Sequence, residues 1–239
     1  MACIIVFASS KGGTGKTTVV ANVGVTMAQL GHKVVLLDAD LMMANLGLML
    51  GLEEQGANLH DVLAEEAELS EAIFSGPGGV KVVPSGISLE GIQRAKLERL
   101  KKVVDELAKK FKFLLIDAPS GLERDAIAAL TMAQKLVLIV TPDIASISNA
   151  FKTKLIAERL NVKTIGAVIN RATSRDVEIP IEEIKSALEL PVLAIIPEDP
   201  EVRRSVALGE PVVTHSPKSP STREFKKLAA ALAKVSDAG

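Results

Sequence analysis

Short apolar runs alternate along the chain with longer segments in which apolar residues recur every three or four positions. The short runs are rich in β-branched residues and apolar on both faces, as buried parallel strands are, and span residues 4–7, 34–37, 80–83, 113–116, 136–140, 165–169 and 192–196. The longer segments predict helices over residues 16–30, 94–110, 147–160 and 181–188, with a last amphipathic helix near 221–235. This alternation predicts an α/β fold with a single doubly wound, mostly parallel sheet flanked by helices.

One domain, residues 1–239, accounts for the whole pattern. The chain has no internal repeat and no low-complexity linker. The stretch Gly76-Pro77-Gly78-Gly79 predicts a turn into the third apolar run. Residues 211–220 are rich in Pro, Ser and Thr and lead into the last helix, so we assign them to the closing segment of the same domain.

Composition limits the functions that this fold can carry. Aromatic residues make up 3% of the chain, with no Tyr and no Trp, which excludes an aromatic platform for stacked bases. The net charge of −1 disfavours a protein that coats nucleic acid. Cys3 is the single cysteine, so one chain can form neither a disulfide nor a multi-thiolate metal site. Residues 1–8 lack the basic flank of a signal peptide, and no apolar run reaches the roughly 20 residues of a membrane span, so we expect a cytoplasmic protein.

A glycine-rich loop follows the first apolar run and opens the first helix. Residues 9–18 read SSKGGTGKTT, the context of a phosphate-binding loop, although Ser10 stands where the general pattern has its leading glycine. The glycines let the backbone wrap phosphate groups, Lys16 neutralises β/γ charge, and Thr17 offers its hydroxyl to Mg²⁺. The expected nucleotide contacts are Gly12, Gly13, Thr14, Gly15, Lys16, Thr17 and Thr18.

Lys11 is the feature that singles out one class of phosphate loop. Residues 11–18, KGGTGKTT, resemble the deviant Walker A signature of the MinD/ParA (SIMIBI) class of P-loop ATPases. The resemblance implies an ATP-dependent homodimer in which Lys11 acts on the phosphates bound by the other subunit, comparable to an arginine finger supplied in trans. An ordinary surface lysine beside the loop is the alternative.

Carboxylates follow two further apolar runs. The second run ends in Asp38-Ala39-Asp40, a spacing that places both acids on one side if the strand geometry persists. The resemblance makes Asp38 a Mg²⁺-shell group and Asp40 the catalytic group that orients the attacking water, with helix capping as the alternative for both. Residues 113–116 lead into Asp117, in the layout of a Walker B carboxylate that holds Mg²⁺, and Gly121 is expected to offer its amide to the γ-phosphate.

Two segments resemble the adenine-contacting parts of the family. Asn170 and Arg171 follow the 165–169 run, and Pro197, Glu198 and Asp199 follow the last run. An asparagine amide pairs with the edge of adenine as donor and acceptor, and the Asn-Lys-x-Asp guanine motif is absent from the sequence, so ATP is favoured over GTP. A plain turn role for Asn170 remains open.

The resemblance covers nearly the whole chain and is greatest for archaeal MinD. It implies a Mg²⁺-dependent ATPase that acts as an ATP-dependent monomer/dimer switch in division-site placement or related spatial organisation, hydrolysing ATP to ADP and phosphate. Iron-protein relatives need cysteine pairs, which one cysteine cannot supply. A ParA-like partition ATPase that binds DNA non-specifically is the alternative, disfavoured by the near-neutral charge. A phosphorylating ligase of the same superfamily is a third reading.

The sequence departs from the bacterial MinD pattern in two regions linked to partners. Pro142-Asp143 follows Thr141 where the family more often has Asn-Pro-Glu, so the identity of any regulator or effector protein stays open. The last helix carries an alanine-rich apolar stripe with one aromatic residue, which favours packing on the sheet over insertion into a membrane. A membrane-peripheral location is therefore retained as the second choice.

Overall fold

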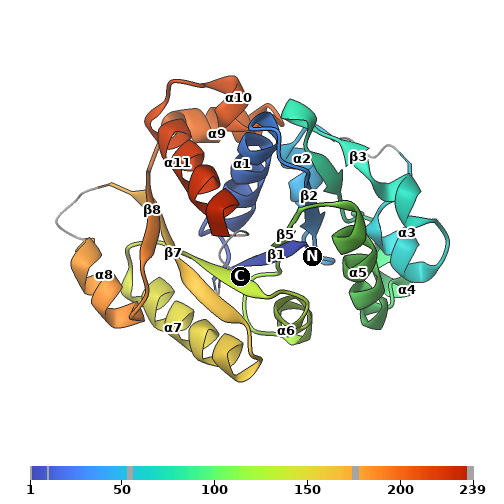
Figure 1. Ribbon diagram of the computed structural model, residues 1–239, viewed down its shortest axis with the longest axis horizontal. Helices are drawn as coiled ribbons and strands as arrows, with labels where there is room; N and C mark the ends of the chain where they lie inside the picture. Colours follow the sequence, from blue (N-terminus) through green and yellow to red (C-terminus); the bar gives the residue numbers. More distant parts are fainter. Residues whose placement is uncertain (1, 10, 53–55, 174–177, 236–239) are drawn as a thin grey trace.

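The computed structural model describes residues 2–9, 11–52, 56–173 and 178–235 and confirms the expected doubly wound sheet (Figure 1). Eight strands of these residues are hydrogen-bonded in the order β3-β4-β2-β5-β1-β6-β7-β8. They are β1 (Cys3–Ala8), β2 (Val34–Asp38), β3 (Phe74–Ser75), β4 (Lys81–Val83), β5 (Phe113–Asp117), β6 (Lys135–Val140), β7 (Lys163–Ala172) and β8 (Val192–Pro197). All pairs are parallel except β3 with β4, an edge pair that the sequence pattern did not predict.

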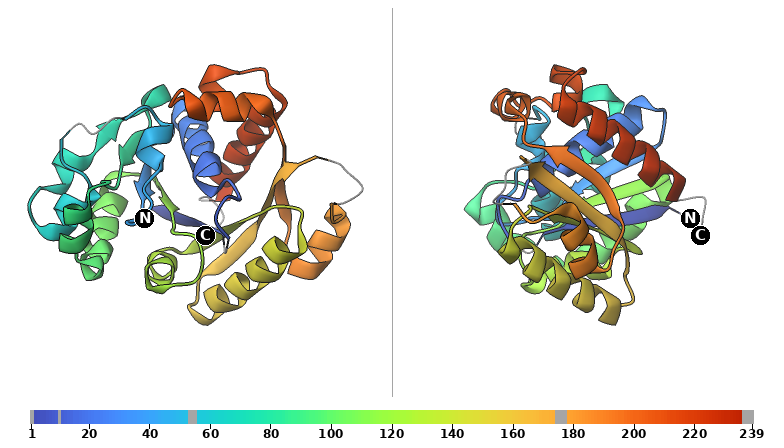
Figure 2. Two further views of the ribbon diagram at one scale, coloured as in Figure 1. Left: turned by 180° about the vertical axis from the view of Figure 1, so that it is seen from behind. Right: turned by 90° about the vertical axis from the view of Figure 1, so that its left-hand side faces the viewer.

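Helices cover both faces of the sheet (Figures 1 and 2). They are α1 (Lys16–Gln29), α2 (Leu46–Met49), α3 (Leu59–Ala64), α4 (Leu89–Arg94), α5 (Leu100–Lys110), α6 (Arg124–Thr131), α7 (Ile144–Arg159), α8 (Ile181–Leu188), α9 (Pro200–Ala207), α10 (Val212–His215) and α11 (Pro220–Val235). Alternate residues of β1 belong to two core layers. Ile5 and Phe7 join the layer with α1 and α11, whereas Ile4 and Val6 join the layer with α3, α5, α6, α7 and α8.

The last helix packs on the protein, as its composition predicted. Phe225, Leu228 and Leu232 on α11 are at most 1% exposed and belong to the core layer that contains α1. Both views of Figure 2 show α11 beside α1 over the sheet. Among the described residues, no helix is long and apolar enough to cross a membrane.

The helix predicted over residues 94–110 is wrong over residues 95–99. Helix α4 ends at Arg94, Ala95 and Lys96 are extended, and a 3₁₀ turn, Leu97–Arg99, precedes α5. The break lets α4 pack on α3, where a Cβ at Gly91 would lie 3.1 Å from His60 Nδ1. The apolar periodicity continues through the break without Gly or Pro, so periodicity alone reads one helix.

Helix α7 begins three residues earlier than predicted, at Ile144. Asp143 is its N-cap, because its carboxylate accepts a hydrogen bond from the Ser146 amide at 2.9 Å. Helices α2, α3, α6, α9 and α10, of four to eight residues, were not predicted, because short segments carry a weak periodic signal; the eight-residue α8 was predicted.

Strand order brings the three acid- or glycine-bearing loops together. Strands β2 to β5 lie on one side of β1 and β6 to β8 on the other, so the winding direction reverses at β1. Asp117 at the end of β5 is in register with Phe7 of β1 and Asp38 of β2. Ligands of open α/β sheets bind beyond the strand ends at such a reversal, which locates the candidate site.

Candidate functional site

The loop after β1 has the shape that a bound phosphate group requires. Gly13 and Gly15 have φ of 82° and 84°, in the left-handed region that favours glycine. Gly15 is the N-cap of α1 and provides no side-chain acceptor, so the first-turn amides are available to a ligand. The Thr14 hydroxyl is buried with no hydrogen-bond partner among the described residues. Together, these unsatisfied donors fit a phosphate-bearing ligand.

Lys16 lies inside the site and is paired with the Walker B acid. Its Nζ donates to Asp117 Oδ1 at 2.6 Å, and the two side chains are 7% and 1% exposed. Asp38, in register with Asp117, is fully buried. Burial and the charge of Asp117 raise the pKa of Asp38 to about 8, against the opposing effects of the Leu46 amide and Lys16. The site thus holds one cation against two buried carboxyl groups.

The strand geometry that would place Asp38 and Asp40 on one side does not persist, because β2 ends at Asp38. Asp38 Oδ2 accepts from the amides of Asn45 and Leu46 at 3.2 and 3.1 Å, and its Oδ1 accepts from the Asp40 amide at 3.2 Å. Asp40 is partly exposed, and its Oδ1 accepts from the Met43 amide at 2.9 Å. Both acids therefore also order the loop of residues 38–45.

The oxygen donors around these acids fit Mg²⁺. Thr17, Asp38 and Asp117 offer one hydroxyl and two carboxylates, the donor types that Mg²⁺ prefers together with water and phosphate oxygens. In the described part of the chain, no cluster of three or more His, Cys, Asp or Glu could hold a metal by itself. The set is therefore suited to a metal that arrives with a nucleotide.

Gly121 has a different place from the one expected. Its amide donates to the Ser9 carbonyl at 3.0 Å and ties the loop after β5 to the phosphate loop. Ser9 was not singled out by the sequence. Ser10, which breaks the general pattern, lies outside the described residues.

The predicted adenine contacts converge on one cavity of about 400 Å³ beside the phosphate loop. Its lining contains Gly13, Gly15, Thr18, Asn170, Arg171, Pro197, Glu198 and Asp199. The Asn170 amide donates to the Thr14 carbonyl at 2.7 Å, and a Cβ at Gly15 would lie 2.2 Å from Asn170 Nδ2. Only glycine fits there, so Asn170 and the loop are packed as a unit.

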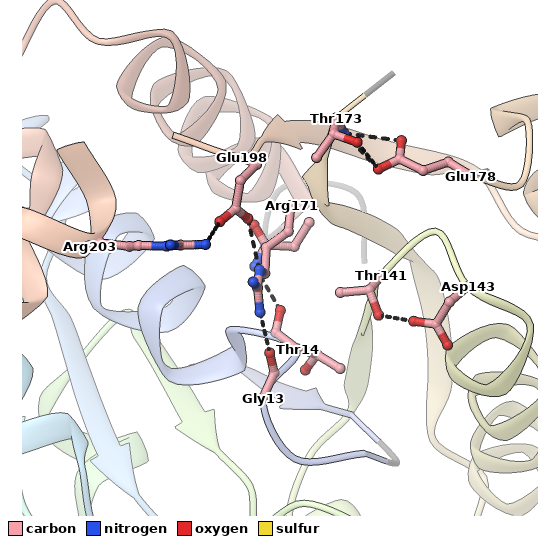
Figure 3. Close-up of polar contacts among 10 residues, drawn as sticks. Gly13, Thr14, Thr141, Asp143, Arg171, Thr173, Glu178, Glu198 and Arg203 are labelled. Atoms are coloured by element: carbon pink, nitrogen blue, oxygen red, sulfur yellow. Dashed lines mark hydrogen bonds and ion pairs between the residues drawn. The ribbon is translucent and has the colours of Figure 1, made fainter. Parts of the chain in front are cut away.

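Two arginines bind Glu198 at the rim of this cavity (Figure 3). Arg171 Nε and Arg203 donate to the two Glu198 carboxylate oxygens at 2.8 and 2.6 Å. Arg171 also donates to the Gly13 carbonyl at 3.3 Å. Burial raises the pKa of Glu198, but the hydrogen bonds and charges of both arginines outweigh it and the pKa is lowered. Arg203 was not predicted. It lies in the first turn of α9, five residues after Glu198, and this spacing was the available signal for a contact between the two side chains.

Asp199 lines the cavity, but its carboxylate serves the fold. Its Oδ1 accepts from the Glu201 amide at 3.0 Å as the N-cap of α9, and its Oδ2 accepts from the Ser221 hydroxyl at 2.7 Å. Burial alone raises the pKa of Asp199, and the hydrogen bonds from Ser221 and Glu201 reverse the shift and lower it.

Lys11, near the start of the loop, is exposed, whereas Lys16 and Asp117 are buried. It borders a second cavity of about 510 Å³, which Arg171 and Glu198 separate from the first. Asp143 lies on the far wall, where Thr141 donates to it at 2.6 Å (Figure 3). Burial raises the pKa of Asp143, but hydrogen bonds from Thr141 and Ser146 and the Lys11 charge lower it overall.

Comparisons with known proteins agree on one group. Residues 5–212 match the family model described as the CobQ/CobB/MinD/ParA nucleotide binding domain. The chain is 44% identical over 232 residues to an uncharacterized ATP-binding protein of Methanocaldococcus jannaschii, covering 97% of this chain and 88% of the relative.

Solved structures give the same result. The structure of the septum site-determining protein MinD complexed with Mg-ADP from Pyrococcus horikoshii is similar with a TM-score of 0.94 and 36% identity, covering 98% of this chain and 97% of that one. The MinC:MinD cell division protein complex of Aquifex aeolicus is similar with a TM-score of 0.87 and 29% identity, covering 97% and 96%.

Proposed function

This chain belongs to the CobQ/CobB/MinD/ParA family of nucleotide-binding proteins, and from that premise we propose that it is a MinD-like, Mg²⁺-dependent ATPase that switches between monomer and ATP-bound dimer. The carrying observation is the opposite placement of two lysines in one phosphate loop. Lys16 is buried beside Asp117, whereas Lys11, near the start of the same loop, is exposed. We infer that the exposed lysine neutralises phosphate charge on a facing molecule.

The substrate and cofactor follow from the site and from the Mg-ADP complex of the similar Pyrococcus protein. ATP or ADP would occupy the loop between Gly12 and Thr18 and the cavity at Asn170. Thr17, Asp38 and Asp117 would hold Mg²⁺, which neutralises charge on the β- and γ-phosphates when bound. The chain's own steps are transfer of Lys16 from Asp117 to the phosphates and orientation of the attacking water by Asp40.

The cellular role that we propose is division-site placement or related spatial organisation, in the cytoplasm or peripheral to the membrane. Support comes from the names of similar proteins, which include septum site-determining protein MinD. A regulator or effector protein is expected as partner, since one similar structure is a MinC:MinD complex. Any membrane contact would use a surface other than the apolar stripe of α11, which is buried.

The test is sedimentation velocity of the protein with Mg-ATP and with Mg-ADP, together with ATP turnover. The parental protein is expected to dimerise with Mg-ATP and to remain a monomer with Mg-ADP. Lys11→Ala should still bind ATP but neither dimerise nor hydrolyse it, because its contact is made in trans. Lys16→Ala should lose tight nucleotide binding, since the principal cation of the site is gone.

The matched control is Lys33→Ala, which removes an exposed lysine beside the opposite end of β2. It should behave as the parent. A Lys11→Ala protein that dimerises and hydrolyses ATP at the parental rate would overturn the proposal. Co-sedimentation of the ATP-bound dimer with DNA and not with anionic liposomes would support the ParA-like alternative instead.

A further inference from the structure

The loop that carries Asp40 is hydrogen-bonded to a histidine of α3. His60 is 1% exposed, and its ring Nε2 lies 3.0 Å from the carbonyl oxygen of Leu41, the residue after Asp40. A carbonyl oxygen only accepts, so Nε2 must carry the ring proton and donate it. The bond therefore fixes both the tautomer of His60 and the position of the Leu41 carbonyl.

Among the described residues, the bond from Nε2 to Leu41 is the one hydrogen bond of the His60 ring. Nδ1 is buried and has no partner in the part of the chain that the structure describes. It faces α4 at Gly91, where a Cβ would come within 3.1 Å. An unpartnered nitrogen in the core costs free energy, so an apolar residue would pack there with less loss. The imidazole therefore occupies a core position where packing alone does not require a polar ring.

A second bond anchors the other end of the same segment. The Ser85 hydroxyl, in the loop after β4, donates to the Asp38 carbonyl at 2.9 Å. The two anchors belong to one rigid unit, because the Leu59 amide donates to the Pro84 carbonyl at 2.9 Å and ties the start of α3 to the same loop. A capping box at Asn58 fixes the first turn of α3. Asp40 thus lies between two carbonyls held by one neighbouring unit.

We propose that His60 is a positioning residue for ATP hydrolysis: its hydrogen bond to Leu41 sets the place of the Asp40 carboxylate relative to the phosphate loop. This inference rests on the proposed function, in which Asp40 orients the attacking water. The Asp40 carboxylate accepts one hydrogen bond, from the exposed Met43 amide of the same loop, so the side chain itself is not bonded to the body of the protein, whereas the Asp40 amide donates to Asp38. A displacement of about 1 Å at a catalytic group can cost up to about 10²-fold in rate, so the anchor matters to turnover more than to binding.

The test compares His60→Gln with His60→Leu. A Gln side chain carries its amide nitrogen the same number of bonds from the backbone as His Nε2, so it keeps the donor, whereas Leu fills the space without one. Hydrogen–deuterium exchange of residues 39–45 should be faster in His60→Leu than in the parent and near parental in His60→Gln. ATP turnover should fall about tenfold in His60→Leu at unchanged ATP affinity and ATP-dependent dimerisation, with recovery in His60→Gln.

Ile184→Val, a core substitution in α8 under the far end of the sheet, controls for a general loss of stability and should alter neither readout. Parental exchange of residues 39–45 in His60→Leu would overturn the anchor. Faster exchange together with parental ATP turnover in His60→Leu would overturn the proposed effect of His60 on hydrolysis. Absence of ATP hydrolysis in the parental protein would instead defeat the proposed function, and the exchange data would still decide whether His60 holds the loop.

Discussion

At the scale of single residues, Asp40 separates chemistry from binding. Its side chain is partly exposed and bonds within its own loop, so its removal leaves the core intact. We expect Asp40→Ala to lower ATP turnover by about 10²-fold, the scale of a positioned acid or base, while Lys16 and the loop amides keep ATP bound. The variant should accumulate as an ATP-bound dimer, measured by turnover and sedimentation on the same sample.

Asp117→Ala is the contrasting variant for that experiment. It removes the acceptor of buried Lys16 and one expected oxygen of the Mg²⁺ shell, so Mg²⁺-dependent binding itself should weaken. Normal turnover in Asp40→Ala, or a failure of that variant to bind ATP, would move the water-orienting role to another group.

His60 gives a pH dependence of stability with a definite sign. Burial lowers the pKa of its imidazole, against the raising effects of the Leu41 carbonyl and Asp61. The unfolded chain therefore binds a proton that the folded one does not, and this contribution to stability is lost as pH falls below about 6.5, the ordinary histidine value. Its slope is at most about 1.4 kcal/mol per pH unit.

Urea unfolding of the parent and His60→Gln at pH 7.5 and 5.5 measures this contribution. The stability of the parent relative to His60→Gln should decrease at the lower pH, since His32 and His215 are common to both proteins. If the difference in unfolding free energy between the two proteins were the same at both pH values, the pKa of His60 would not be lowered in the folded protein.

At the scale of elements, Asp199 connects the helices α9 and α11. Asp199→Ala removes the N-cap of α9 and leaves the buried Ser221 hydroxyl and amide without their acceptor. We expect a loss of about 2 kcal/mol in unfolding free energy, with ADP affinity within about threefold of the parent. Chemical denaturation and calorimetry measure the two quantities, and Asp199→Asn, which keeps the cap acceptor, should lose less.

The strands and long helices could be predicted because each carries its own signal. Residues 113–117 are uniformly apolar up to the acid that ends the strand, so β5 and Asp117 are read together. Asp199 shows the limit. Its second carboxylate oxygen binds Ser221, 22 positions away, and no local pattern reports that contact. The pairing of Lys16 with Asp117 spans 101 positions and likewise depends on the strand order.

Element boundaries failed where tertiary packing decides them. The sequence reads a continuous helix across Ala95, but packing of α4 on α3 ends it there. The end of the strand at Asp38, which leaves Asp40 in the following loop, was missed for a related reason, since two of the amides that bind Asp38 come from residues 45 and 46. Such contacts follow from the fold and are absent from the local pattern.

At the scale of the whole molecule, nucleotide and metal should stabilise the fold together. In the proposed mechanism ATP would take Lys16 away from Asp117, so ATP without Mg²⁺ would leave two buried carboxyl groups near the phosphates with no cation of their own. At 100 times Kd, Mg-ATP should add about 2.7 kcal/mol, or roughly 5–10 °C in Tm. ATP with EDTA should add much less.

Thermal unfolding with Mg-ATP, ATP plus EDTA, and no ligand measures these shifts. Lys16→Ala is the non-binding control, and its Tm should be the same in all three conditions. Equal shifts with and without Mg²⁺ in the parental protein would remove Asp38 and Asp117 from the proposed metal shell.

Lys135 has a consequence for how this protein can be labelled. Its Nζ donates to the Val235 carbonyl at 2.7 Å and lies 3.8 Å from Cys3 Sγ, so the first strand and the last helix meet at one place. The six residues of β1 then carry the chain roughly 20 Å from there to the phosphate loop. A fluorophore attached at residue 235 would leave the nucleotide site uncovered, whereas residues 2–4 are buried and unsuited to a label. In a dimer closed over its phosphate loops, two such fluorophores would stand roughly 40 Å apart or more, within the range of energy transfer but clear of the interface.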